Sequence, residues 1–197
     1  MKQTLIIMYK KIILVVLIFA SCKSKNEEQI LNKEIINCIE VRSKEYTENL
    51  FNINDIYVKI EKMLIEKKIL SNKDKEGYKK LFTDLFNSKN DKKRYIELYS
   101  EIINNIKYSE MLLYPGFLDL PFECNLLILK KNKLNEVDFY SNYYKSLVDV
   151  FKVMGPGNDQ LYLDLIKNTP NSSMSNIIYR APLLVVVLGS LEYLSRG

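Results

Sequence analysis

The sequence of 197 residues contains no histidine and no tryptophan. Histidine is the usual general base near neutral pH and the commonest metal ligand in proteins. Its absence excludes Ser-His-Asp and Cys-His catalytic arrangements, and it leaves only cysteines and carboxylates for a zinc site. The three cysteines are too few for a four-thiolate zinc site. The sequence therefore predicts no metal, no cofactor and no catalytic constellation.

A strong charge of one sign is also lacking. The formal net charge is +5, but Lys2, Lys10 and Lys11 lie in an N-terminal segment that we expect to be removed. Without them the chain has 29 minus 3, or 26, basic residues against 24 acidic ones. A net charge of about +2 attracts no polyanion strongly, so we predict no nucleic-acid partner.

The first 22 residues have the three-part layout of a secretory signal. The basic pair Lys10-Lys11 precedes the apolar run 12–20, which is followed by the small residue Ser21 and then Cys22. The apolar run has nine residues, whereas a helix that crosses a bilayer needs roughly 20. We therefore predict a cleaved signal peptide over residues 1–21 rather than a permanent transmembrane anchor.

The stretch Phe19-Ala20-Ser21-Cys22 resembles the lipobox of bacterial lipoproteins, in which small residues precede an obligatory cysteine. The resemblance covers only this part of the chain, and Phe19 stands where the family prefers leucine or a similar aliphatic residue. It implies cleavage before Cys22 and lipidation of the Cys22 sulfur. An ordinary signal peptide with a chance cysteine is the alternative.

The resemblance also implies a location. Residues 22–28 would form the lipidated cysteine and a flexible polar tether. The protein would be anchored in the cell envelope by its N-terminal lipid, at the periplasmic or outer face of the outer membrane. Its first partner is thus a membrane.

Residues 29–197 show apolar side chains at helical spacing, which predicts a single all-α domain, a bundle of about six to seven helices. Helices are expected over 29–53, 56–69, 71–85, 92–106, 136–154, 158–166 and 173–195. Pro121 predicts the start of a helix that runs through residue 129, with a short strand over 124–129 as the alternative. In the last helix, residues 181–188 are all apolar, which predicts that Val186 and Leu188 are buried and that Pro182 starts or kinks the helix.

A loop is predicted at Tyr114-Pro115-Gly116-Phe117, because proline and glycine interrupt helices. Loops carry binding residues more often than helix faces do. We therefore take Tyr114, Phe117 and Phe122 as candidate binding residues. Packing of these side chains over the core is the alternative.

Two cysteines remain in the mature chain, Cys38 and Cys124. In an oxidising envelope they can form a disulfide, which would contribute roughly 4 kcal/mol in the chain-entropy model. Alternatively, they are two small buried apolar residues on helix faces.

Binding of another protein is the function that these features favour over catalysis. A small envelope lipoprotein of this kind is similar in size and anchoring to lipid-anchored immunity proteins that neutralise toxins. One alternative is a carboxylate-dependent envelope hydrolase, which a pocket with two converging acids would support. Another is a structural or adhesion lipoprotein, which a surface without a concave site would support.

Overall fold

The computed structural model describes residues 28–46, 51–87, 91–114, 116–153 and 158–196. The predicted signal peptide, Cys22 and nearly all of the predicted tether lie outside these residues. By compactness the chain divides into residues 1–34 and 35–197, and the second unit is described below. The described residues contain eight α-helices and no strand, which confirms the predicted all-α fold with slightly more helices than expected.

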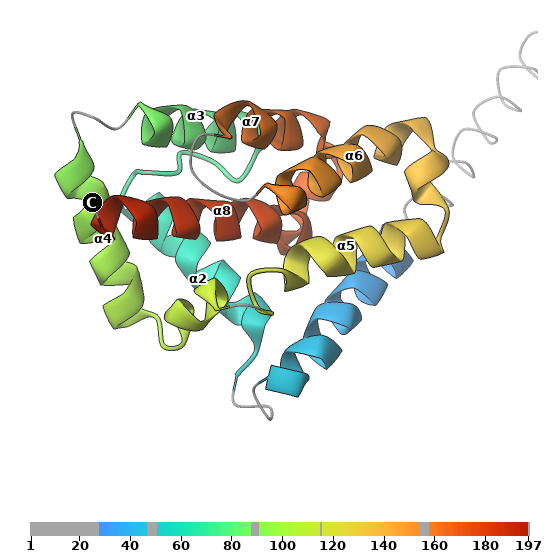
Figure 1. The fold of residues 1–197 in the computed structure, drawn as a ribbon, viewed down its shortest axis with the longest axis horizontal. Helices are drawn as coiled ribbons and strands as arrows, with labels where there is room; N and C mark the ends of the chain where they lie inside the picture. Colours follow the sequence, from blue (N-terminus) through green and yellow to red (C-terminus); the bar gives the residue numbers. More distant parts are fainter. Residues whose placement is uncertain (1–27, 47–50, 88–90, 115, 154–157, 197) are drawn as a thin grey trace, which may run out of the picture. The chain divides into compact units, whose positions relative to one another are not determined.

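Figure 1 shows the helices coloured in their order along the chain. Their bounds are α1 28–46, α2 Ile53–Glu66, α3 Lys75–Phe86, α4 Lys92–Asn105, α5 Leu120–Lys131, α6 Asp138–Lys152, α7 Asp159–Asn168 and α8 Ile177–Arg196. Three short 3-10 helices lie between them, η2 Ser109–Leu113, η3 Leu134–Glu136 and η4 Ser173–Ser175. The helix predicted over 121–129 is thus confirmed, and residues 124–129, for which a strand is the alternative, are helical.

Side-chain caps fix the starts of α2 and α3. The Asn52 Oδ1 accepts a hydrogen bond from the Asn54 backbone N–H at 2.9 Å, and the Asp74 Oδ1 accepts one from the Gly77 N–H at 2.8 Å. A Cβ at Gly77 would lie 2.1 Å from the Asn72 carbonyl oxygen, so only glycine fits there. Helix α2 begins three residues before its predicted start, and α3 begins four residues after its predicted start. The capping residues decide both boundaries.

Helix α8 forms the centre of unit 35–197 and packs against α2, α4 and α5 (Figure 1). Residues 178–188 are all buried, including Val186 and Leu188 as the sequence predicted. By length and composition α8 could cross a membrane, but about two thirds of that stretch is buried inside the protein. A helix that is apolar on every side and covered by amphipathic helices is a core helix.

Pro182 lies inside α8 rather than at its start. Proline has no N–H, so the Ile178 carbonyl one turn earlier loses its helical partner. The side chain of Asn125 on α5 replaces it, since Asn125 Nδ2 donates to the Ile178 oxygen at 3.2 Å and also to the Pro121 oxygen at 2.7 Å. The prediction that Pro182 could begin the helix was therefore wrong, and a buried amide on a neighbouring helix explains why the helix continues.

Candidate functional site

The three aromatic residues predicted to bind a partner do not share one environment. Phe117 and Phe122 are buried, whereas Tyr114, between η2 and α5, is 56% exposed. The packing alternative therefore describes Phe117 and Phe122. Tyr114 is the candidate that presents its ring to solvent.

Phe117 belongs to a cluster of rings drawn from separate segments of the chain. The Tyr46 ring lies 5.2 Å from it, the Phe51 ring lies 5.9 Å from it, and Phe51 stacks on Tyr108 at 4.7 Å between ring centroids. Tyr114 adjoins the cluster, because its carbonyl accepts a hydrogen bond from the Phe117 N–H. We call Tyr46, Phe51, Tyr108, Tyr114 and Phe117 the aromatic end.

The backbone at the aromatic end takes uncommon conformations to bring these rings together. Gly116 has a φ of +92°, and a Cβ there would lie 2.8 Å from the Tyr46 ring. Glycine thus lets Tyr46 pack directly on the loop. Tyr108 has a φ of +67°, which is uncommon for a bulky residue and concentrates at binding sites. The Lys107 Nζ lies 4.6 Å from the centre of the Tyr108 ring, within cation–π distance.

The aromatic end is only partly covered by the rest of the protein. Tyr46 and Tyr114 are exposed, Phe51 and Tyr108 are half-buried, and Phe117 forms the floor. Tyrosine combines a flat apolar face with a polar tip, and it is enriched at protein interfaces. This surface can therefore bind a partner.

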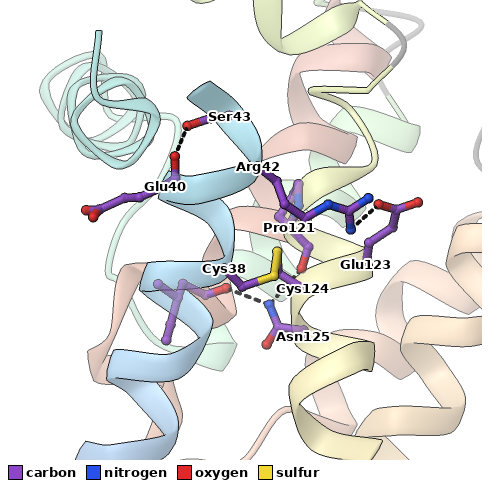
Figure 2. The surroundings of a disulfide bond; sticks show 9 residues. Cys38, Glu40, Arg42, Ser43, Pro121, Glu123, Cys124 and Asn125 are labelled. Atoms are coloured by element: carbon purple, nitrogen blue, oxygen red, sulfur yellow. Dashed lines mark hydrogen bonds and ion pairs between the residues drawn. A yellow bond between two sulfur atoms is a disulfide. The ribbon is translucent and has the colours of Figure 1, made fainter. Parts of the chain in front are cut away.

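A disulfide lies on the neighbouring part of α1. Figure 2 shows Cys38 on α1 joined to Cys124 on α5, with 5.7 Å between the Cα atoms. Beside it, Arg42 on α1 forms an ion pair of 2.5 Å with Glu123 on α5. Of the two alternatives for these cysteines, the structure contains the disulfide. It links α1 to α5 through two cysteines that are 86 residues apart in sequence.

A buried ionic cluster joins α2, α3 and α8. The carboxylate of Glu61 accepts hydrogen bonds from Arg180 Nε at 2.5 Å, from Arg180 Nη2 at 2.9 Å and from the Tyr78 hydroxyl at 2.7 Å. The Lys73 Nζ lies 3.0 Å from the same carboxylate, and Arg180 Nη1 donates to the Met174 carbonyl. Glu61, Tyr78 and Arg180 are all buried. We call these residues the Glu61 cluster.

The electrostatics of the Glu61 cluster favour its charged form. Burial alone would raise the pKa of Glu61, but the hydrogen bonds from Arg180 and Tyr78 outweigh it and hold the pKa below the ordinary value. Burial and the adjacent Glu61 carboxylate raise the pKa of the Tyr78 hydroxyl. This cluster was not predicted from the sequence. The signal for it was Arg180, a charged residue beside an apolar run.

A polar hollow of about 200 Å³ lies between α6 and α7. It is lined by Asn142, Lys145, Ser146, Asp149, Leu161, Asp164 and Asn168, and we call it the α6–α7 hollow. Each helix contributes one carboxylate to it. The hollow could not be predicted from the sequence, because its residues are spread over two helices and form no motif.

The predicted lipidation of Cys22 lies outside the described residues and stays a prediction. In the part of the chain that the structure describes, no three cysteine or carboxylate side chains gather in an arrangement that could hold a metal ion. Comparisons with protein-family models, curated proteins and solved structures find no match. The function must therefore be argued from the residues themselves.

Proposed function

We propose that the protein is a bacterial lipoprotein, anchored to the cell envelope by lipid on Cys22, whose helical domain binds another protein through the aromatic end. The N-terminal sequence carries this proposal. Lys10-Lys11, the apolar run 12–20 and Ser21-Cys22 follow one another in the order and at the spacing that export and lipidation require.

The disulfide between Cys38 and Cys124 supports the envelope location. Disulfides persist in the periplasm and at cell surfaces, but thiol reductants keep cysteines reduced in the cytosol. A structural disulfide that joins α1 to α5 is therefore consistent with an exported protein.

The composition of the aromatic end supports a protein as its partner. Tyr46 and Tyr114 offer exposed rings. Exposed tyrosines around a buried aromatic floor match the composition of protein interfaces, where a few aromatic residues supply most of the binding energy.

The alternative of a carboxylate-dependent hydrolase has less support. Asp149 and Asp164 do line one hollow, but acid catalysis needs one carboxyl that apolar surroundings keep protonated. Asp149 is exposed, and Asp164 accepts a hydrogen bond from Gln160 at 3.0 Å. These two carboxylates are better suited to binding than to proton transfer.

The anchor is tested by expressing the full chain in bacteria supplied with labelled palmitate. We expect label in the natural protein, and none in Cys22→Ala, which should accumulate as uncleaved or mislocalised precursor. Ser24→Ala, two residues further on, is the matched control and should keep the label. Label in Cys22→Ala would show that the anchor is assigned wrongly.

The binding surface is tested with a photo-crosslinking amino acid placed at position 114, and at position 193 as a control, because Tyr193 is equally exposed at 59% on α8. A protein captured only from position 114 is then purified, and its affinity for the natural chain is measured. We expect Tyr114→Ala to weaken binding by at least about tenfold, with Tyr193→Ala unchanged. Equal effects of the two substitutions would contradict the proposal.

A further inference from the structure

A small polar residue on the buried side of α6 lines the α6–α7 hollow. Ser146 lies between Tyr143 and Leu147 in the helix, and all three are buried. At positions that face a neighbouring helix, a large apolar side chain would normally fill the space. Serine leaves it open, and the opening is lined mainly by polar side chains.

Two polar side chains at the floor of the hollow can form further hydrogen bonds. Ser146 is only 7% exposed, and its Oγ accepts a hydrogen bond from Asn168 Nδ2 at 2.8 Å. Asn168 is the one hydrogen-bond partner of Ser146 among the described residues, so the hydroxyl proton has no acceptor there. The amide oxygen of Asn168 likewise receives no hydrogen bond from the described residues. A buried donor and an acceptor therefore remain for a ligand.

The walls carry charges of both signs. Lys145 and Asp149 stand one turn apart on α6, and Asp164 lies across from them on α7. Neither Lys145 nor Asp149 forms an ion pair with another described residue, although opposite charges at this spacing often pair. Leu161 provides the apolar part of the lining.

We propose that the α6–α7 hollow binds a small zwitterion, an α-amino acid or a dipeptide. Its ammonium group lies between Asp149 and Asp164, and its carboxylate faces Lys145 and the Ser146 hydroxyl. Its aliphatic part contacts Leu161. The lining has two carboxylates, Asp149 and Asp164, and one ammonium, that of Lys145. A neutral polyol is a poorer match, because the excess negative charge favours a ligand with a cationic group.

The size of the hollow agrees with this class of ligand. A volume of about 200 Å³ corresponds to roughly seven water molecules at about 30 Å³ each. That is enough for an amino acid or a small dipeptide.

The ligand class is tested by titration calorimetry on the purified full-length lipoprotein in detergent. The probes are L-leucine, L-alanyl-L-alanine, the N-acetyl and amide forms of each, and D-glucose. We expect at least one zwitterion to bind, and each of its blocked forms to bind at least about tenfold more weakly, because a charged hydrogen-bonding group is lost. No binding by either zwitterion, equal binding by its blocked forms, or preferential binding of D-glucose would each overturn the proposal.

Substitutions assign the two ends of the ligand. Asp164→Asn should lower the affinity for the zwitterion by at least about tenfold and leave the affinity for its N-acetyl form unchanged. Lys145→Gln should likewise lower the affinity for the zwitterion and leave the affinity for its amide form unchanged. Asp55→Asn, at an exposed carboxylate on α2, is the matched control and should change neither. Melting temperatures should be equal for all four proteins. An unchanged affinity in Asp164→Asn, or an equal loss in Asp55→Asn, would contradict the assignment.

Discussion

The Glu61 cluster and the α6–α7 hollow bring together similar groups, carboxylates with a basic side chain and a hydroxyl, but with opposite results. In the Glu61 cluster, Arg180, Tyr78 and Lys73 all bind the same carboxylate, which is fully buried. In the hollow, the charges of Lys145 and Asp149 remain unpaired among the described residues. Polar groups that satisfy one another stabilise a fold, whereas polar groups left unsatisfied in a concave place are available for a ligand.

The largest difference is expected when a leucine is replaced by aspartate, once in the core around α8 and once in the wall of the hollow. Leu188→Asp would put an unpaired charge into the core that α8 forms, a loss of several kcal/mol against a total stability of about 5–15 kcal/mol. We expect the chain not to fold. Leu161→Asp, at the half-buried wall of the hollow, should cost only about 1 kcal/mol. Urea unfolding followed by circular dichroism measures both, and equal losses would contradict the distinction.

Neutralising one carboxylate in each region gives the next largest difference. Glu61→Gln leaves Arg180 buried without its counter-ion, so we expect a loss of about 3–5 kcal/mol in the free energy of unfolding. Asp164→Asn should change it by less than about 0.5 kcal/mol. If Glu61→Gln were as stable as the natural chain, the Glu61 cluster would have no structural role.

Acidification should affect the two regions differently as well. The pKa of Glu61 is lower in the folded chain than the ordinary value of 4.5, so its contribution is present above that value and is lost as the pH falls through the folded pKa. Between about pH 5 and about pH 3, the melting temperature should fall more steeply for the natural chain than for Glu61→Gln. Parallel curves would show that Glu61 does not couple folding to protons.

The smallest expected change is at the aromatic end. Tyr114→Ala should alter the free energy of unfolding by less than about 0.5 kcal/mol because its ring is exposed, while Phe117→Ala should cost about 3–5 kcal/mol because its ring is buried. Chemical denaturation of the two variants checks this. A large loss in Tyr114→Ala would assign Tyr114 to the fold and remove it from the binding surface.

The all-α fold and the central position of the last helix could be predicted because they depend on periodic apolar residues. The run 181–188 has no polar residue, and only burial satisfies such a helix. The exact helix starts could not be predicted, because Asn52 and Asp74 were two of many side chains able to cap a helix. That Pro182 does not begin the helix could not be predicted for a similar reason, since the amide that compensates for it comes from Asn125, far away in sequence.

The candidate sites were less predictable than the fold. Tyr114 could be proposed from its loop. That Tyr114 is exposed while Phe117 and Phe122 are buried depends on how α1, α2 and α5 pack together. The Glu61 cluster joins residues 119 positions apart, and the hollow needs Ser146 and Asn168 on different helices. Such sites arise from tertiary packing, so periodicity along the chain carries no signal for them.

The proposed lipid anchor on Cys22 would place the aromatic end and the hollow in the cell envelope. Mass spectrometry of the N-terminal peptide, released from the membrane fraction of cells that produce the full chain, tests it most directly. We expect a peptide that begins at Cys22 and carries the mass of a diacylglyceryl group on the sulfur. A peptide that begins elsewhere, or an unmodified Cys22, would contradict it.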